Sequence, residues 1–183
     1  MGRLIMWNLI TLDGCFEGPE KWSLDFHDTA WGDELQDYSM EQLESASMIV
    51  FGRVTYEGMA NYWPTAKGRI AEFMNSIPKV VFSNTVHRAD WNNTRIIGGN
   101  ATDEVPRLKS EASKDLLLFG SAALAADLMR AGQIDEYRLC LAPIVLGNGR
   151  PLFKPSSDST RMRLLEALPL QTGGIILRYE PAG

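Results

Sequence analysis

The hexapeptide from Gly52 to Glu57 carries residue types that can hold a phosphate group. Arg53 and Thr55 follow a short apolar segment and the glycine that ends it, so a guanidinium and a hydroxyl stand on the first turn of an expected helix. A guanidinium grips a phosphate through two hydrogen bonds, and the first turn of a helix adds unpaired N–H groups. A plainer alternative stays open, in which Arg53 pairs with a surface carboxylate and Thr55 caps the helix.

Similar turns follow two later apolar segments. Gly120 and Ser121 separate the apolar residues 115–119 from an alanine-rich helix expected at 122–131, and Ser83-Asn84 ends the apolar residues 79–82. Glycine lets a backbone approach a ligand closely, although it can equally serve only a tight turn. Because parallel strands end at one edge of a sheet, these turns predict a phosphate-binding edge.

Asp13 is the candidate catalytic carboxylate. The apolar residues 4–12 predict a buried strand, and Asp13-Gly14 follows it directly, so the carboxylate stands at a strand tip. The next residues, Cys15 to Gly32, are rich in aromatic and charged side chains and are predicted to form a long loop, a candidate lid over a site. An Asp-Gly pair is also an ordinary turn signal.

Other chemistries lack their residues. The sequence has no Gly-x-Gly-x-x-Gly fingerprint, no phosphate-binding P-loop and no Gly-x-Ser-x-Gly elbow. The two cysteines, Cys15 and Cys140, lie far apart without paired spacing, so we expect free thiols and no metal. There are only two histidines, His27 and His87, so neither Ser/His/Asp hydrolysis nor Cys/His catalysis is indicated.

The elements that must position these residues alternate between strand and helix. This order predicts an α/β fold with a mixed, mostly parallel sheet, helices on both faces and a closing antiparallel hairpin. A single domain is expected over residues 1–183. The strands are predicted at residues 4–12, 47–51, 79–82, 94–97, 115–119, 136–145, 162–168 and 175–179, and the helices at 33–45, 52–62, 102–112 and 122–131.

Composition limits the class of protein and partner. The chain has 183 residues, of which 45% are hydrophobic and 22% charged, as in ordinary globular proteins. The net charge is −5 and the basic residues are dispersed, so we expect a small-molecule substrate rather than nucleic acid. No apolar run approaches the ~20 residues of a membrane span, and the amino terminus does not read as a signal peptide, so we expect a cytoplasmic protein.

Six short pieces, in the right order, together resemble a known family. It is the dihydrofolate-reductase-like family, which includes dihydrofolate reductase and the reductase domain of the bifunctional riboflavin-biosynthesis deaminase/reductase, and the likeness is greatest to the latter. The resemblance spans nearly the whole chain. The pieces are Thr11-Leu12-Asp13-Gly14, Gly52-Arg53-Val54-Thr55-Tyr56-Glu57, Val80-Val81-Phe82-Ser83, Phe119-Gly120-Ser121-Ala122-Ala123-Leu124, Ile134-Asp135-Glu136-Tyr137, and residues 143–153 from Pro143 to Phe153.

The resemblance implies an NADPH-dependent reductase that transfers a hydride to a small heterocyclic or sugar-bearing substrate. It places Arg53 and Ser83-Asn84 beside the 2′-phosphate of the cofactor. It also implies a homodimer, for which the apolar, loop-like segment 143–153 is a candidate interface. The full set of expected cofactor-binding residues is Gly52, Arg53, Thr55, Ser83, Asn84, Gly120, Ser121, Ala122 and Ala123, and the expected substrate-binding residues are Thr11, Asp13, Trp22 and Tyr56.

The sequence also departs from the riboflavin-type reductases. Those enzymes have a basic residue soon after Asp-Gly, where this chain has Cys15-Phe16, and an Asp-Asp-Pro segment followed by an arginine, where it has Glu57-Gly58-Met59. A ribosyl-phosphate substrate is therefore not implied. Asp33 and Asp37 match the substrate-binding acid of dihydrofolate reductase only approximately. A dihydrofolate or pterin reductase and a non-catalytic NADP-binding protein remain alternatives.

Overall fold

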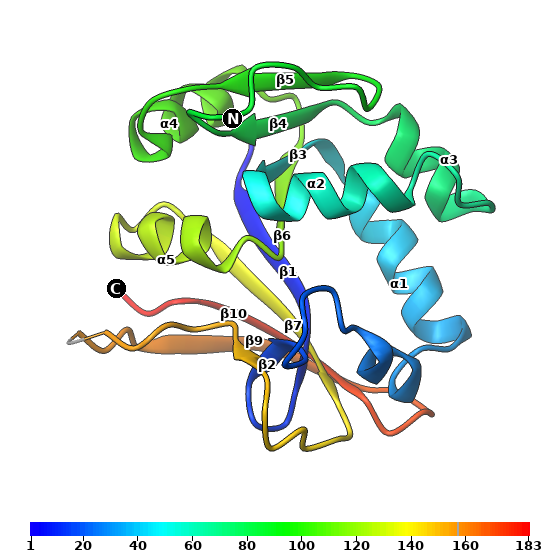
Figure 1. Cartoon of the computed structure of the whole chain (residues 1–183). Coiled ribbons are helices and arrows are strands. Elements are labelled where there is room, and N and C mark those ends of the chain that lie inside the picture. The colour runs from blue at the N-terminus through cyan, green and yellow to red at the C-terminus, as the bar shows by residue number, and fades with distance from the viewer. Residues whose placement is uncertain (157) are drawn as a thin grey trace.

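The structure is a computed structural model that describes residues 1–156 and 158–183. Strands and helices alternate along much of the chain, with a 3-10 helix at Asp25–Thr29 (Figure 1). The strands are β1 (Leu4–Thr11), β2 (Cys15–Glu17), β3 (Ala46–Gly52), β4 (Lys79–Phe82), β5 (Thr94–Ile97), β6 (Asp115–Phe119), β7 (Glu136–Ala142), β8 (Arg150–Pro151), β9 (Met162–Pro169) and β10 (Ile175–Pro181). The helices are α1 (Asp33–Glu44), α2 (Arg53–Tyr62), α3 (Arg69–Ser76), α4 (Ala101–Glu111) and α5 (Ala122–Arg130).

The main sheet has eight strands in the order β5-β4-β3-β6-β1-β7-β10-β9. The pairs from β5 through β7 are parallel, and β7-β10 and β10-β9 are antiparallel. The predicted α/β class, with a mostly parallel sheet and a terminal antiparallel hairpin, is confirmed. All eight predicted strands and all four predicted helices form, within a few residues of the expected ends.

Helices cover both faces of this sheet (Figure 1). The strict alternation of β1 divides its side chains between the faces. Met6 joins the cluster that contains Leu128 of α5, while Ile5 joins the cluster with Leu43 of α1 and Met74 of α3. The interior strands are apolar on both sides, as expected for parallel strands covered by helices.

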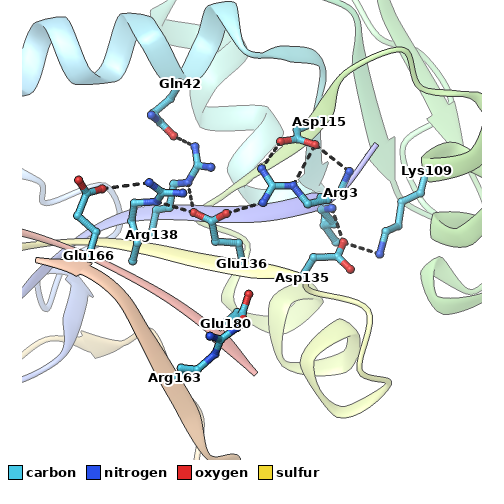
Figure 2. A network of polar contacts seen from close by, with 12 residues as sticks. Arg3, Gln42, Lys109, Asp115, Asp135, Glu136, Arg138, Arg163, Glu166 and Glu180 are labelled. Atoms are coloured by element: carbon cyan, nitrogen blue, oxygen red, sulfur yellow. Dashed lines mark hydrogen bonds and ion pairs between the residues drawn. The ribbon is translucent and has the colours of Figure 1, made fainter. Parts of the chain in front are cut away.

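A buried carboxylate ties β7 to the antiparallel β10 and to Arg3, which precedes β1, at the amino ends of the parallel strands (Figure 2). Glu136, the first residue of β7, has a side chain that is 1% exposed and accepts hydrogen bonds from Arg3, Arg138 and Arg178 at 2.7–2.8 Å. Burial alone would raise the pKa of Glu136, but the hydrogen bonds and charges of Arg138 and Arg178 outweigh it and hold the pKa at about 2. The network thus lies at the edge of the sheet opposite to the carboxyl ends of the parallel strands.

The segment 15–32 differs from the long loop predicted. It contains β2 and the 3-10 helix, and Phe26 of that helix is buried against the core. β2 pairs with β8, a strand that the sequence analysis placed in a loop. β7 also ends at Ala142, before the predicted Val145. Within the described part of the chain, no helix is both long enough and apolar enough to cross a membrane.

Candidate functional site

A cleft of about 800 Å³ lies at the carboxyl ends of the parallel strands. This is the size of a small-molecule or cofactor site. All nine residues predicted to bind a cofactor line this cleft, although they come from three separate turns of the sequence. They are Gly52, Arg53, Thr55, Ser83, Asn84, Gly120, Ser121, Ala122 and Ala123.

The first turns of α2 and α5 are bonded to each other. Ser121 Oγ accepts a hydrogen bond from the N–H of Gly52 at 2.9 Å, and the N–H of Ser121 donates to Thr55 Oγ1 at 2.8 Å. Neither helix has a side-chain cap. Two helix amino termini therefore present N–H groups and positive partial charge to one cleft, which favours an anion.

Gly120 keeps this turn open. Its φ is +52°, and a Cβ atom added to it would lie 3.1 Å from two side-chain atoms of Thr55. A larger residue would be strained there and would fill the space between the two helix starts. The glycine is thus required both for the turn and for close access to the helix termini.

Arg53 and the turn at 83–84 form the other end of the predicted cofactor set. Arg53 pairs with Glu57 at 3.1 Å, as the plainer reading of the sequence expected, and it also lines the cleft. The ion pair is exposed and so contributes little, which leaves the guanidinium available to a stronger anion. Asn84 Oδ1 accepts from the N–H of Gly99 at 2.7 Å, and Ser83 Oγ accepts from the N–H of Val86 at 3.0 Å.

Trp22 forms a wall of the cleft and is held in an uncommon backbone conformation. Its φ is +67°, a region that costs a non-glycine residue about 1–2 kcal/mol. The carboxylate of Glu17 accepts its N–H and also pairs with Arg150 at 3.3 Å. The indole lies directly on Gly58 of α2, where an added Cβ atom would come within 1.8 Å of Trp22 Cζ2. Trp22, which was predicted to bind substrate, is thus held in the wall of the cleft by its contacts with Glu17 and Gly58.

Sequence reasoning missed further polar residues of the cleft, among them Asn8 and His27. Burial lowers the pKa of His27 to about 4, although the charge of Asp28 opposes the shift, so the imidazole is neutral at pH 7. The two have no motif in the sequence that could have identified them. The apolar part of the lining includes Trp7, Leu9, Phe16, Leu24, Met59 and Phe119.

The other predicted substrate residues lie outside this lining. Tyr56 is buried against Trp91, with ring centroids 6.2 Å apart. Thr11 is buried, and its hydroxyl donates to Asp13 at 2.6 Å. Asp13 also accepts the N–H groups of Leu146 and Gly147, at 3.2 and 2.9 Å. The bond from Thr11, followed by that from Gly147, lowers the pKa of Asp13, so its carboxylate is ionised and occupied in holding a loop.

We therefore expect Asp13→Asn to lower Tm while leaving ligand affinity and hydride transfer near normal. The new amide can accept from one partner, but its NH2 group cannot accept the loop N–H groups. Thermal unfolding and single-turnover kinetics of the same variant test this. An unchanged Tm with a ~10²-fold loss in the chemical step, the usual scale for a positioned acid or base, would instead assign Asp13 the catalytic role expected from the sequence.

Comparison with known proteins supplies the family. The model of the RibD C-terminal domain matches residues 3–176. This chain belongs to the RibD C-terminal domain family.

In the residues that the structure describes, no group of three or more His, Cys, Asp or Glu side chains could hold a metal ion.

Relatives of this RibD C-terminal domain protein include two from Bacillus subtilis (strain 168). The uncharacterized protein YyaP is 29% identical over 97% of this chain and 94% of its own length, and the uncharacterized protein YwjB is 26% identical over 88% of each. The likeness to both proteins thus extends over most of the chain, and neither name states an activity.

Solved structures share the fold of this RibD C-terminal domain. A putative riboflavin biosynthesis protein from Shewanella sp. PV-4 has a TM-score of 0.83 at 19% identity, with 99% of both chains covered. Acinetobacter baumannii RibD has a TM-score of 0.73 at 16% identity, covering all of this chain and 59% of that one. Dihydrofolate reductase from Enterococcus faecalis, complexed with NADP(H), has a TM-score of 0.68 at 13% identity, covering 100% and 98%. The dihydrofolate-reductase-like fold expected from the sequence is confirmed.

Proposed function

We propose that the protein is an NADPH-dependent reductase of the riboflavin-biosynthesis type, which reduces a C=N or C=O group of a small heterocyclic substrate. The observation that carries the proposal is the bonded pair of helix starts, at Gly52 and Ser121, facing one cleft lined by every residue expected to bind the cofactor. Membership of the RibD C-terminal domain family supports the same activity.

The cleft residues fit this cofactor. The space above Gly120, which a Cβ would fill, and the uncapped starts of α2 and α5 suit a pyrophosphate. Arg53 and Ser83 line the same cleft, and a guanidinium is the side chain best suited to a 2′-phosphate, which supports the role proposed for them. NADPH, when bound, supplies the hydride.

The remaining lining suits a flat, apolar ring. Trp22, Phe16 and Phe119 offer aromatic surface, and they exclude water from the ring that they contact. Catalysis then rests mainly on orientation, with the proton delivered by water, because Asp13 is ionised and His27 is neutral. Asp33 and Asp37 of α1 are exposed and outside the lining, so the acid of a folate-type site is not supplied from there.

An NADPH-oxidation assay tests the proposal directly. The purified protein is titrated with NADPH by calorimetry and then assayed with an aminopyrimidine ribosyl phosphate, dihydrofolate and a panel of cyclic imines and ketones. We expect NADPH binding and oxidation with a heterocyclic acceptor. Binding without oxidation over the whole panel would favour the non-catalytic alternative, and absence of binding would refute the proposal.

Arg53→Ala is expected to weaken NADPH binding by about 1–3 kcal/mol and to leave NADH binding nearly unchanged, because only NADPH carries the 2′-phosphate. Calorimetry with both cofactors measures the difference. Glu57→Gln is the matched control, since it removes the partner of Arg53 but keeps the guanidinium, and it should retain full affinity for NADPH. Equal losses for both cofactors in Arg53→Ala would contradict the assignment.

The homodimer is a separate prediction. Val145 and Phe153, in the segment proposed as the interface, have 64% and 41% of their surface exposed, which is high for apolar side chains. We expect light scattering to give about twice the chain mass of 20.4 kDa at micromolar concentration. Val145→Asp should return the mass to that of one chain. A single-chain mass for the unmodified protein would refute the dimer.

A further inference from the structure

The amide of Asn8 is fixed in one orientation. Asn8 lies in β1 and lines the cleft, and its Oδ1 accepts a hydrogen bond from the N–H of Gly120 at 2.7 Å. A backbone N–H can only donate, so the oxygen of the amide must face Gly120 and the NH2 group must face away from it. The two ends of this amide are therefore distinguished by chemistry.

The NH2 group has no hydrogen-bond partner among the described residues. Asn8 is 7% exposed, and its Nδ2 is buried without an acceptor. Buried polar atoms are nearly always satisfied, because an unpaired buried donor loses its bonds to water without replacement. An unsatisfied donor in the wall of a cleft therefore points to an acceptor that arrives with a ligand.

The surroundings restrict the chemistry of that acceptor. Asn8 is neutral, and two apolar residues that pack on its own face of the sheet, Phe82 and Leu124, line the same cleft. His27, also in the lining, has a pKa of about 4 because of burial and is uncharged at neutral pH. Gly120, to which the amide is bonded, belongs to the turn that favours an anion, so a phosphate oxygen is the competing acceptor, whereas a carbonyl oxygen can be satisfied by one neutral donor.

We propose that Asn8 Nδ2 donates a hydrogen bond to an amide or lactam carbonyl oxygen of a ring bound in the cleft, and that Asn8 is a specificity-determining residue. The inference rests on the proposed function. Two rings carry such an oxygen, the nicotinamide of the cofactor through its carboxamide and a lactam-bearing heterocyclic substrate. The bond through Gly120 links this donor to the turn that starts α5, so the ring is positioned relative to the helix termini.

NMR of the unmodified protein provides the first test. The side-chain amide signals of protein labelled with 15N-asparagine are followed, with the Asn8 signal identified by its loss in Asn8→Asp. The protein is titrated with 2′,5′-ADP, with 2′-phospho-ADP-ribose, which keeps the pyrophosphate but has no nicotinamide, with NADP+, and with pterin in the presence of NADP+. We expect the first two ligands to leave the Asn8 protons in place, and a shift with 2′-phospho-ADP-ribose would assign a phosphate oxygen and overturn the carbonyl. A downfield shift with NADP+ but not with 2′-phospho-ADP-ribose assigns the carboxamide, and a shift only with pterin assigns the substrate.

Asn8→Asp provides the second test. The aspartate keeps an acceptor for Gly120 and loses the NH2 donor, but it also adds a negative charge beside a turn that favours an anion. The uncharged Asn8→Leu is therefore measured with it, and in both variants the affinity for the ligand that shifts the signal should fall at least 10-fold. Asn75→Asp is the matched control, because Asn75 Oδ1 also accepts an N–H, from Trp91 at 2.7 Å, and lies outside the cleft. It should leave all affinities unchanged.

The outcomes separate this inference from the proposed function. Absence of binding by 2′,5′-ADP and NADP+ would refute the cofactor, whereas absence of an Asn8 shift with every probe would overturn the Asn8 assignment. Unchanged affinities in a folded Asn8→Asp would overturn it as well. If the aspartate prevents folding, Asn8→Leu alone serves to identify the Asn8 signal and to test the affinity.

Discussion

Glu136→Ala is expected to lower the free energy of unfolding by about 3–5 kcal/mol, the usual effect of removing one partner from a buried ionic group. The substitution leaves the guanidinium groups of Arg3, Arg138 and Arg178 without the carboxylate that they share. Most of the loss is expected from the unpaired charge of Arg138, because its side chain is nearly as buried as that of Glu136. Chemical denaturation at pH 7 gives the value.

The matched control is Asp90→Ala. Asp90 pairs with Arg88 at 2.7 Å, the same distance as between Glu136 and Arg138, but both side chains are about four-fifths exposed or more. It should therefore cost at most about 1 kcal/mol. Comparable losses in the two variants would show that burial of the Glu136 network does not determine its contribution.

The same network sets a dependence of stability on pH. The pKa of Glu136 falls from an ordinary 4.5 to about 2 on folding, so between these values the unfolded chain binds more protons than the folded one. Its contribution, about 3 kcal/mol from the size of the shift, is present above pH 4.5 and is lost as the pH falls toward 2. Glu136→Ala should accordingly show a weaker acid dependence than the unmodified protein.

Gly58→Ala is expected to have the second large effect. Alanine favours a helix over glycine by about 1 kcal/mol, but the new methyl group would overlap the indole of Trp22. Because overpacking costs about 1–3 kcal/mol and the indole must move, we expect a lower unfolding free energy together with weaker binding of a ring in the cleft. Denaturation and ligand titration measure the two effects.

A double variant separates the overlap from other causes. In Gly58→Ala combined with Trp22→Leu, the overlap is removed, so the alanine should then stabilise α2 relative to Trp22→Leu alone. If Gly58→Ala destabilises both backgrounds equally, the contact between α2 and Trp22 does not restrict position 58.

Much of the fold could be predicted because its signals are local. The apolar runs of β3 and β6, and the glycine and serine turns after them, identify parallel strands that each lead into a helix. The short helix α3 was missed because its eight residues make only about two turns, although Ile70, Phe73 and Met74 recur at helical spacing. β8 has two residues and depends entirely on its pairing with β2, which no sequence pattern records.

The candidate site divides in the same way. The turns that line the cleft could be found from the sequence, because the residue types that suit a phosphate, Arg53, Thr55 and Gly120, stand within a few residues of an apolar segment. The predicted roles of Asp13 and Tyr56 are not supported by their positions, because partners distant in the sequence occupy both side chains. Asn8 and His27 could be identified only from the tertiary structure. Packing leaves the Asn8 NH2 group without a hydrogen-bond partner, and burial lowers the pKa of His27.

The strand order has a consequence for how the chain folds during synthesis. β1 is made before both of its partners in the described sheet, β6 and β7, which begin at Asp115 and Glu136. A growing chain therefore carries an unpaired apolar strand until more than a hundred further residues have been made. Pairing between strands so distant in the sequence slows folding and leaves aggregation-prone surface exposed. We therefore expect this protein to depend on chaperones until β1 is paired with β6 and β7.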